Sequence, residues 1–338
     1  VGLLECIDKV DADMRDGDFR WTWDEGHKRL AWGLAIGYKN TGLGGGAPDK
    51  ATAEVEAWQD PDKGLVAEVR ISSPEMGQGL PGVLSACAAE ELGIPTESVN
   101  VLLGDTDVCP DGGPTTASRQ TFVSGNAARH AARDVAKKLA DAPGTRVVAQ
   151  HEYWAPATQP LGTGGDMHVA FSFVAQAALC EIDMRTGEVQ VRRIVAAHDV
   201  GRAINPLTLE GQIEGGIVMC IGYALTEHYI QEEGKPWTNV MARYKTPSIT
   251  HAPSITSHIV EHELSTGPFG AKGMGELPSI VTAPAITNAI YNATGVRVRS
   301  LPVDQDTLLH AINAGATEVE LGWGDRESIP TIEFGGEH

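Results

Sequence analysis

The chain has 338 residues, of which 42% are hydrophobic, so it can bury a sizeable core in two or three lobes or in one large unit. Its 26 lysines and arginines against 45 aspartates and glutamates give a formal net charge of −19, which argues against a nucleic-acid or membrane-surface role. No apolar run approaches the ~18 residues of a membrane span, and the N-terminal sequence lacks a basic-then-apolar signal pattern, so we expect a cytoplasmic location.

The cysteines and histidines offer no clear metal-binding pattern. Five cysteines are scattered without a C-x-x-C pair, which argues against a disulfide framework, a zinc site and an iron–sulfur cluster. His258 and His262 have helical spacing, but their stretch lacks the H-E-x-x-H order, and its isoleucine and valine content is typical of a strand.

The first predicted unit is a strand, a loop and a helix. GLVAEVRISS alternates apolar and polar residues, which predicts a strand, and PEMGQG predicts a loop. LPGVLSACAAEELGIP predicts a helix, because its apolar residues share one face and Gly93 supplies a stop.

A surface helix is predicted next, in SGNAARHAARDVAKKLADAPG, with Ser124 as its N-cap. The composition changes at residues 141–145, and we place the division between two lobes there. The expected lobes are residues 1–144 and 145–312, followed by a C-terminal tail over residues 313–338.

The second half of the chain repeats this kind of unit. ALCEIDMRTGEVQVRRIVAAHDVG predicts a hairpin turning at Thr186 and Gly187, and RAINPLTLEGQIEGGIVMCIGYAL predicts a loop and a helix. GAKGMGELPSIVTAPAITNAI predicts another loop and helix, which ends at Gly295 before the strand VRVRSLPV. These elements predict an α+β fold, in which two lobes of mixed sheets and helices clamp an extended ligand between glycine loops.

Three glycine-bearing loops lead into helix N-termini, where unpaired N–H groups and the helix dipole favour anionic oxygens. Neither G-x-G-x-x-G nor the P-loop pattern occurs, which argues against an ordinary dinucleotide site. The loops carry Gln78, Gln212 and Glu276 beside their glycines, and glutamine suits the edge of a nitrogen heterocycle because it both donates and accepts. Such loops are also often simple turns, and their recurrence is what favours a ligand site.

A fourth loop, GDTDVCPDGGPTTASRQTFVSGNA, surrounds one arginine with hydroxyl and amide side chains. That combination suits phosphate oxygens or the edge of a nucleotide base. The residues concerned are Thr115, Thr116, Ser118, Arg119, Gln120 and Thr121.

Glu276 has two interpretations. A carboxylate in the first turn of a helix is stabilised by the dipole and needs no catalytic role. The flanking glycines, however, would let a ligand approach, and the uncharged Leu-Pro-Ser-Ile-Val that follows would shield the carboxylate from water. Desolvation raises the pKa of a carboxyl group, as a general base at neutral pH requires. Arg202, in GRAINP, is consistent with a simple loop brace.

Taken in order, the motifs resemble the cofactor-binding C-terminal half of the molybdenum subunit of the xanthine dehydrogenase/aldehyde oxidase family. The matching motifs are MGQG, GDTD with PTTASRQT and GNA, AAHDVGRAINP with EGQIEGG, and GAKGMGELP with APAITNAIYNATG. The resemblance spans roughly residues 30–312. It implies a two-lobed molybdenum-cofactor-binding domain and a molybdopterin dinucleotide, expected in its cytosine form. The molybdenum would be held through the pterin dithiolene, with no protein side chain as a ligand.

Carried over by position, the resemblance implies a role for each matched residue. Gln78, between Gly77 and Gly79, would lie beside the oxygen ligands of the molybdenum or beside the pterin. Glu276, after Gly275, matches the family's catalytic base. The pterin and phosphate would be held by Ala117, Ser118, Arg119, Gln120 and Thr121, and the pterin edge by Gln212.

One departure concerns length. Molybdenum subunits of the family are usually about twice as long, and the motifs of their substrate-gripping first half are absent here. Either the chain is a fragment or the subunit is naturally split, and we expect the split form, which resembles the medium molybdopterin subunit of nicotinate dehydrogenase. The resemblance then implies a companion chain, an iron–sulfur subunit with 2Fe-2S clusters, and a flavin subunit with FAD.

The implied reaction is hydroxylation of a nitrogen heteroaromatic substrate, such as nicotinate, with oxygen derived from water. Three alternatives stay open. The chain could belong to an aldehyde- or purine-oxidising member of the family, it could be a metal-free paralogue that acts as a scaffold, or it could bind an ordinary dinucleotide. A sulfido and a selenido ligand on the metal are equally compatible with the sequence.

Overall fold

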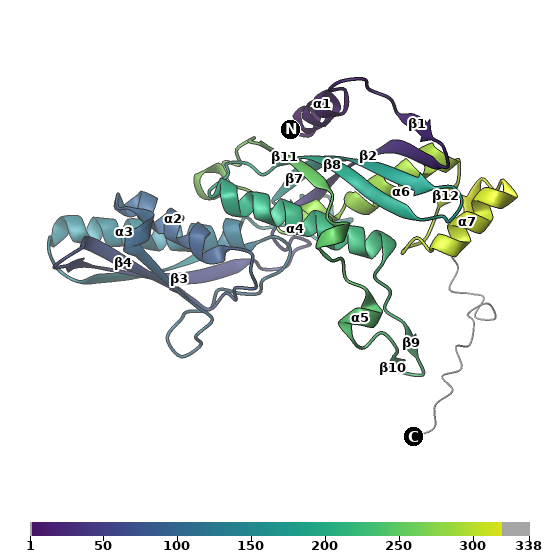
Figure 1. Ribbon diagram of the computed structural model, residues 1–338. Coiled ribbons are helices and arrows are strands. Elements are labelled where there is room, and N and C mark those ends of the chain that lie inside the picture. Colours follow the sequence, from purple (N-terminus) through teal and green to yellow (C-terminus); the bar gives the residue numbers. More distant parts are fainter. Residues whose placement is uncertain (1, 320–338) are drawn as a thin grey trace.

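The computed structural model describes residues 2–319 and is organised by two larger β-sheets (Figure 1). The first sheet has the strand order β1-β2-β7-β8-β11. Neighbouring strands are antiparallel, except that β11 runs parallel to β8. Its strands are β1 (Thr22–Glu25), β2 (Lys28–Thr41), β7 (Ala170–Asp183), β8 (Val189–Asp199) and β11 (Ser254–Val260).

The second sheet has the order β5-β4-β3-β6 and is also mixed, because β4 and β5 are parallel and the other pairs are antiparallel. Helices α2 (Leu80–Leu92) and α3 (Gly125–Asp141) pack on it and share its hydrophobic core. Its strands are β3 (Lys50–Asp60), β4 (Gly64–Ile71), β5 (Val99–Leu103) and β6 (Val147–Trp154).

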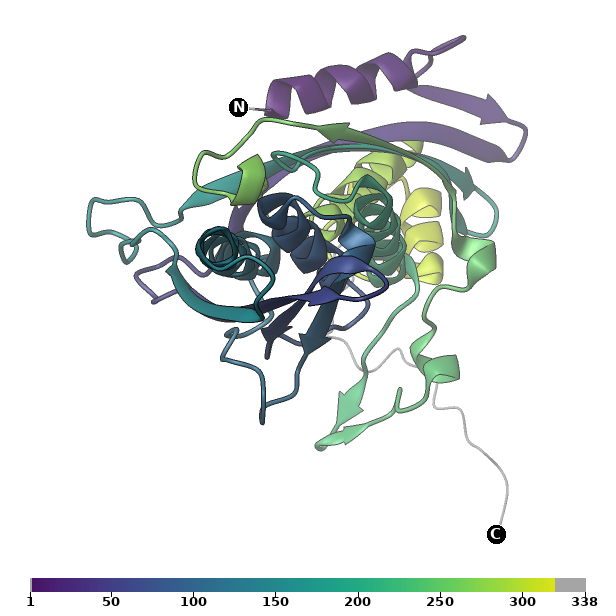
Figure 2. The same ribbon diagram turned by 90° about the vertical axis from the view of Figure 1, so that its left-hand side faces the viewer.

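Helices cover both faces of the first sheet. Figure 2 shows α1 (Leu3–Met14) on one face, and α4 (Pro206–Leu225) with α6 (Thr282–Thr294) on the other. The alternation of side chains along a strand produces this layering. On β8, Ile194 and Ala196 belong to the core beneath α4 and α6, whereas Val195 and Ala197 belong to the core beneath α1.

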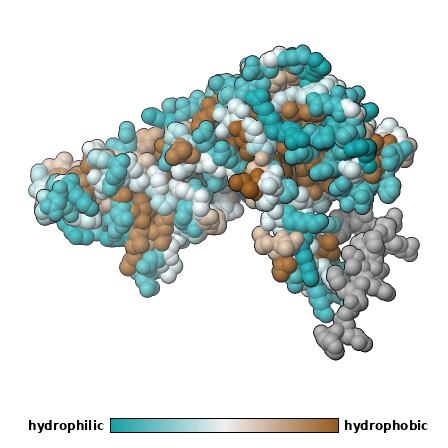
Figure 3. All heavy atoms as spheres, viewed as in Figure 1, coloured by the Kyte–Doolittle hydropathy of each residue, from teal (hydrophilic) through white to brown (hydrophobic). Residues whose placement is uncertain are grey.

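Shorter elements complete the described chain. They are α7 (Gln305–Ala314), the pair β12 (Arg297–Val298) and β13 (Glu318–Val319), and single turns at η1 (Thr96–Ser98), η2 (Gln120–Ser124), η3 (Ile249–His251), η4 (Pro268–Gly270) and η5 (Leu277–Ser279). A segment between α4 and β11 projects from the body and carries β9 (Gln231–Glu232), β10 (Lys235–Pro236) and α5 (Met241–Tyr244). Hydrophobic residues lie on the surface of this projection (Figure 3), where Trp237 and Met241 are exposed. Within residues 2–319, no helix has the length and apolar character needed to cross a membrane.

The predicted α+β fold with mixed sheets is confirmed, as are several of its elements. Helices α2 and α6 end at Gly93 and Gly295, both in the left-handed conformation, and the β7–β8 hairpin turns at Gly187. Ser124 occupies the predicted N-cap position directly before α3, but it does not cap the helix. Ser124 has helical dihedral angles and makes no capping bond, because the turn η2 already runs into α3 from Gln120.

The sheets divide the chain differently from the predicted ranges 1–144 and 145–312. Strand β6 pairs with β3, and β2 pairs with β7, so each sheet takes strands from both sides of residue 144. The change in composition at residues 141–145 marks only the turn between α3 and β6, which pack together. Of the predicted tail, residues 313–319 include the end of α7 and β13, and residues 320–338 lie outside the described residues.

Candidate functional site

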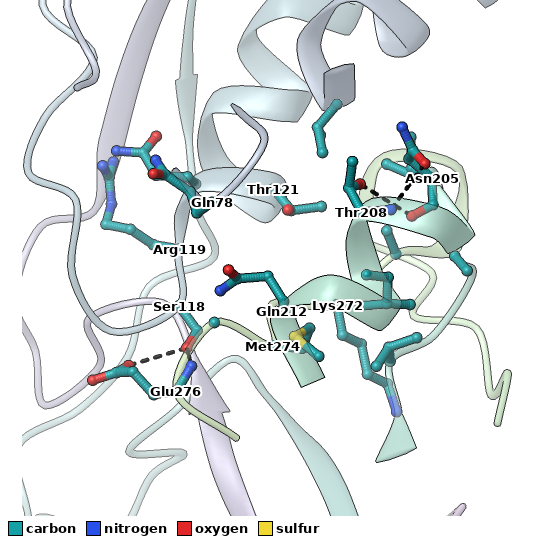
Figure 4. Close-up of a pocket in the computed structure, with 18 of the residues that line it drawn as sticks. Gln78, Ser118, Arg119, Thr121, Asn205, Thr208, Gln212, Lys272, Met274 and Glu276 are labelled. Carbon is teal, nitrogen blue, oxygen red and sulfur yellow. Dashed lines mark hydrogen bonds between the residues drawn. The ribbon is translucent and has the colours of Figure 1, made fainter. Parts of the chain in front are cut away.

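Four segments that are far apart in the sequence line one cavity of about 350 Å³. They are the β4–α2 loop, the loop before α3, the β8–α4 connection with the first turns of α4, and the loop before η5 (Figure 4). The structure thus brings together the loops that the sequence singles out. Eight of the eleven predicted site residues line the cavity: Gln78, Ser118, Arg119, Gln120, Thr121, Gln212, Gly275 and Glu276.

The other three predicted residues, Gly77, Gly79 and Ala117, give the loops their shape. Gly77 and Gly79 have φ angles of 102° and 79°, in the region that favours glycine. Ala117 and Ser118 adopt the same region, with φ angles of 49° and 51°, although both carry a Cβ atom. Two consecutive residues of this kind are costly, and such strain persists only where the surroundings fix it.

The surroundings that fix Ser118 belong to the loop that carries Glu276. A Cβ atom on Gly273 would lie 1.7 Å from the Ser118 carbonyl oxygen, so only glycine permits the two loops to approach this closely. The Ser118 hydroxyl accepts a hydrogen bond from the Glu276 backbone N–H at 3.1 Å and donates one to Glu276 Oε2 at 3.0 Å. The strained turn therefore places one hydroxyl group directly on the predicted base.

Arg119 does not offer its guanidinium to a ligand. The side chain is fully buried, and Nε donates to Asp49 Oδ1 at 2.6 Å. The two terminal nitrogens donate to the carbonyl oxygens of Gly112, Pro114 and Lys50. The expectation that this guanidinium contacts phosphate is therefore wrong for the structure described. Arg119 instead ties the loop before α3 to the start of β3.

The β4–α2 loop also uses its polar groups internally. Glu75 accepts hydrogen bonds from the backbone N–H groups of Gly77, Gly79 and Leu80, so a carboxylate of the chain itself occupies the N-terminus of α2. The expected anion site at this helix is thus filled by Glu75. Gln78 accepts from Met76 N and donates to the Pro74 carbonyl, which holds its amide within the same loop.

Gln120 and Gln212, the other two glutamines predicted at the site, differ in whether their side-chain amides are hydrogen-bonded within the chain. Gln120 is buried, and its amide is bonded to the Pro114 carbonyl and to the hydroxyl groups of Thr115 and Ser124. Gln212, on the second turn of α4, points into the cavity (Figure 4), and its amide has no hydrogen-bond partner among residues 2–319. Gln212 is thus the glutamine whose donors and acceptor are available to a ligand.

Glu276 lies at one end of the cavity with its side chain 49% exposed. The residues that follow it do not cover it as expected, because Leu277 and Pro278 turn into the core beneath α4 and are themselves buried. The prediction that the residues after Glu276 shield its carboxylate from water is therefore wrong. Its nearest contacts are the Ser118 hydroxyl and the Lys39 ammonium group, whose Nζ lies 3.1 Å from Oε2.

Buried polar contacts hold the Glu276 loop on the first sheet. The Gly273 N–H donates to Thr41 Oγ1 at the end of β2, and the Gly273 carbonyl accepts from Ser172 Oγ on β7. Thr41 and Ser172 are both buried. Because both backbone groups of Gly273 are bonded, this residue is fixed between the sheet and the Ser118 turn.

An ion pair joins this loop to the GRAINP segment. Lys272 Nζ lies 2.8 Å from Asp199 Oδ2, and both side chains are buried. The Gly201 N–H donates to the other oxygen of Asp199. Neither residue of the pair was expected at the site, although an aspartate directly after a buried strand and a lysine inside an otherwise apolar loop are the signals that could have suggested it.

A second buried network supports the segment after Glu276. Gln176, on β7, donates to the Pro278 carbonyl at 2.9 Å and accepts from Thr282 Oγ1 at 2.6 Å. His198 lies 3.4 Å from the Gln176 amide, and its Nδ1 has no hydrogen-bond partner in the described part of the chain. Burial lowers the pKa of His198 to about 3, so this imidazole stays neutral and serves as a packing element.

Asn205 and Thr208 lie at the side of the cavity away from Glu276 (Figure 4), and Arg202, three residues before Asn205, also lines the cavity. Asn205 caps α4 by accepting from Thr208 N. The Arg202 guanidinium forms no ion pair or hydrogen bond with any residue from 2 to 319, whereas the other two cations in the lining, Arg119 and Lys272, are bonded to carboxylates. Arg202 is thus the lining cation that is available to an anionic ligand.

The described part of the chain contains no group of three or more histidine, cysteine, aspartate or glutamate side chains placed to hold a metal ion. His258 and His262 instead contact Asp13 and Glu5 of α1. The cysteines are buried, and burial raises the pKa of Cys87 and of Cys180 to about 12.

Comparison with known proteins identifies the family of the chain. A family model described as a molybdopterin cofactor-binding domain matches residues 5–152 and 142–253. A probable xanthine dehydrogenase subunit of Bacillus subtilis (strain 168) is 28% identical over 327 residues, which cover 85% of this chain and 43% of the relative. The gamma subunit of the 6-hydroxypseudooxynicotine dehydrogenase complex of Paenarthrobacter nicotinovorans is 32% identical over 280 residues, covering 71% of this chain and 35% of the relative.

Among solved structures, the aldehyde oxidoreductase from Desulfovibrio desulfuricans ATCC 27774 superimposes with a TM-score of 0.75 at 30% sequence identity. The match covers 91% of this chain and 34% of that protein, and the chain spans less than half the length of the relatives described above. The chain belongs to the molybdopterin cofactor-binding family, which includes molybdenum-binding subunits of xanthine dehydrogenases and aldehyde oxidoreductases.

Proposed function

We propose that this chain is the cofactor-binding part of a molybdenum hydroxylase and that its cavity holds a molybdopterin dinucleotide. The observation that carries the proposal is the gathering of four family motifs around one cavity, whose lining includes the Glu276 carboxylate and an Arg202 guanidinium that has no partner among residues 2–319. Ligand pockets typically combine a concave surface with a few converging polar groups, and this cavity has that character.

The free polar groups fit such a cofactor. The Gln212 amide can both donate to and accept from the edge of a pterin, and a guanidinium is a good partner for phosphate oxygens. Gln78, Ser118 and Thr121 line the same cavity and would lie against the cofactor. Because the Arg119 and Gln120 side chains are buried and hydrogen-bonded within the chain, their proposed contribution is to shape the loop that carries Ser118 and Thr121.

In the bound state, the cofactor would supply the redox centre that accepts two electrons from the substrate. The part of this chain would be to orient the cofactor, to hold the substrate side of the cavity in place, and to accept a proton on Glu276. A carboxylate that takes a proton from the attacking oxygen acts as a general base, a contribution worth about 10²- to 10⁴-fold in rate.

For the substrate, we propose a nitrogen heteroaromatic compound such as nicotinate, with oxygen taken from water. Conversion of a ring C–H into C–OH with water releases two electrons and two protons, and the electrons would leave through 2Fe-2S and FAD on partner subunits. The named substrate of the Paenarthrobacter relative, 6-hydroxypseudooxynicotine, supports this choice. We further propose, from the resemblance to a split molybdopterin subunit, that a companion chain supplies the rest of the substrate site; the relatives are more than twice as long as their matched parts. The cytosine form of the dinucleotide and the cytoplasmic location stay predictions.

A second candidate is oxidation of an aldehyde or a purine. It is favoured by the relatives named aldehyde oxidoreductase and xanthine dehydrogenase, which share similar identity with this chain. The cavity of this chain suits either reaction, since both would use the same cofactor and the same base.

The test is to purify the complex that assembles around this chain and to determine its molybdenum content by elemental analysis. About one molybdenum per copy, together with CMP released on hydrolysis of the cofactor, is expected. A metal-free complex would support the scaffold alternative instead. Nicotinate, benzaldehyde and hypoxanthine, each assayed with a dye as electron acceptor, would separate the substrate classes.

The role of the base is tested by Glu276→Gln. This variant should keep its molybdenum and lose turnover by about 10²-fold or more, because the amide cannot take up the proton. Turnover close to that of the wild type, at full molybdenum loading, would refute the assignment.

A further inference from the structure

The Glu276 carboxylate is held through only one of its two oxygens. Ser118 Oγ donates to Oε2 at 3.0 Å, and the Lys39 Nζ atom lies 3.1 Å from the same oxygen. Oε1 accepts no hydrogen bond from any residue in the described range 2–319. The carboxylate thus has a fixed oxygen and an open oxygen.

The direction of the Ser118 hydrogen bond is set by its surroundings. Because the Glu276 backbone N–H already donates to the Ser118 oxygen, the hydroxyl proton is directed to the carboxylate. The backbone of Ser118 cannot drift away, since its carbonyl lies against Gly273 and the neighbouring Ala117 carbonyl accepts from Gly42 N. Ser118 is therefore a rigid donor.

Lys39 comes from another element, the last part of β2. Its ammonium group also donates to Asn40 Oδ1 at 2.8 Å, and the Asn40 amide in turn donates to the Gly42 carbonyl. The Lys39 side chain is only 22% exposed, which is low for lysine. The contact with Asn40 holds the ammonium group beside Glu276 and leaves at least one of its three N–H donors for the carboxylate.

We propose that Lys39 is a positioning residue, which together with Ser118 holds Glu276 by Oε2 and so presents Oε1 as the oxygen that accepts the proton. In that transfer, the O–H bond of the attacking hydroxyl breaks, and a new O–H bond forms at Oε1. The proposal rests on the proposed role of Glu276 and adds the residue that orients this base. Lys39 touches neither cofactor nor substrate in this account.

A purely structural role for Lys39 would leave turnover unchanged. Partly exposed ion pairs of this kind contribute little to stability, so loss of the pair should hardly affect folding. Orientation of a catalytic group is more sensitive, because displacement by about an ångström can cost up to about 100-fold in rate. The two roles can thus be separated by measuring unfolding and turnover in the same variant.

The first experiment compares Lys39→Met with Lys28→Met in the molybdenum-loaded complex. Lys28 lies at the opposite end of the same strand and pairs with Glu181, so it is a matched control. Lys39→Met should lower kcat by about 10- to 100-fold per bound molybdenum with KM nearly unchanged, and Lys39→Arg should restore much of the loss. Lys28→Met should match the wild type in both constants. Equal kcat in the two methionine variants would overturn the proposal, as would a raised KM at unchanged kcat, which would make Lys39 a substrate contact.

The second experiment does not depend on turnover. Amine-reactive labelling of the complex with acetic anhydride, followed by peptide mass spectrometry, measures how accessible Lys39 is. Lys39 should react faster in Glu276→Ala than in the wild type, and Lys28 should react equally in both. Unchanged Lys39 reactivity would contradict the contact itself. If Glu276→Gln stayed active while the labelling result held, the assigned base would be wrong but the contact would stand.

Discussion

Lys272 and Asp199 form a buried ion pair that joins two of the segments lining the cavity. Lys272 Nζ lies 2.8 Å from Asp199 Oδ2, with the two side chains 8% and 0% exposed. Lys272 belongs to the loop of the predicted base, and Asp199 ends β8 just before the GRAINP segment. Their pairing fixes the loop that carries Glu276 relative to the segment that carries Arg202.

Removal of the lysine should therefore be strongly destabilising. Lys272→Met leaves Asp199 buried without a counter-charge, a change that typically costs about 3–5 kcal/mol. Urea denaturation of the variant should show this loss. Lys137→Met provides the control, because Lys137 pairs with Asp134 in an exposed position, where such pairs contribute about 0–1 kcal/mol. Equal denaturation midpoints for the two variants would contradict the account.

Gly273→Ala should disrupt the site through sterics alone. The added methyl group would lie 1.7 Å from the Ser118 carbonyl oxygen, so one of the two loops must move. We expect lower molybdenum content in the purified complex, measured by elemental analysis. Gly215→Ala in α4 is the control, since nothing lies within 4 Å of its added carbon, and alanine favours the helix by up to about 1 kcal/mol. Full molybdenum loading of Gly273→Ala would show that the close approach is dispensable.

Arg202→Met should weaken retention of the cofactor without affecting the fold. The Arg202 guanidinium has no partner among residues 2–319, so its loss leaves no buried charge behind. If it binds phosphate oxygens, the variant should lose molybdenum and nucleotide together during gel filtration, whereas Arg202→Lys should lose less. Arg185→Met, in the exposed β7–β8 turn, is expected to retain both. Wild-type retention by Arg202→Met would exclude the phosphate contact.

His198 should make the fold sensitive to acid. Burial lowers the pKa of His198 to about 3 in the folded chain, whereas the unfolded chain has a pKa of about 6.5. Between these values the unfolded chain binds a proton that the folded chain does not, so this residue destabilises the fold progressively as the pH falls below about 6.5. The slope from one such group approaches about 1.4 kcal/mol per pH unit. His198→Gln should reduce the difference between the urea midpoints at pH 7.5 and pH 5, and an unchanged difference would contradict the assignment.

Local elements of this fold follow from the sequence, because their signals are local. Helix α2 could be predicted from an apolar stripe and Gly93, and the β7–β8 hairpin from Thr186 and Gly187. The pairing of β2 with β7 has no such signal, since the two strands are far apart in the sequence and neither strand's residues indicate which strand it pairs with. The predicted lobe boundary at residue 144 therefore followed a change in composition instead of the sheets.

Prediction of the site from the sequence is limited in the same way. Gathering of the four loops could be anticipated from their motifs, but the state of individual side chains could not. The sequence suggests that Arg119 binds phosphate, but its guanidinium is paired with Asp49, which directly precedes the first strand of the second sheet. Glu276 looks shielded by its apolar neighbours, yet Leu277 turns inward and leaves the carboxylate half exposed. Contacts between distant segments decide which side chains are already hydrogen-bonded within the chain and which stay available to a ligand.

The register of β2 with β7 also has a consequence for how the molecule folds. Thr41 and Ala170 are paired neighbours, so the whole second sheet with α2 and α3 is inserted between two adjacent strands of the first. Long-range pairing of this kind must overcome the entropy of closing a long loop, which makes it a late and slow event. The same loop closure that pairs β2 with β7 also brings the Ser118 turn next to the Glu276 loop. The candidate site and the completed sheet should accordingly form together, late in folding.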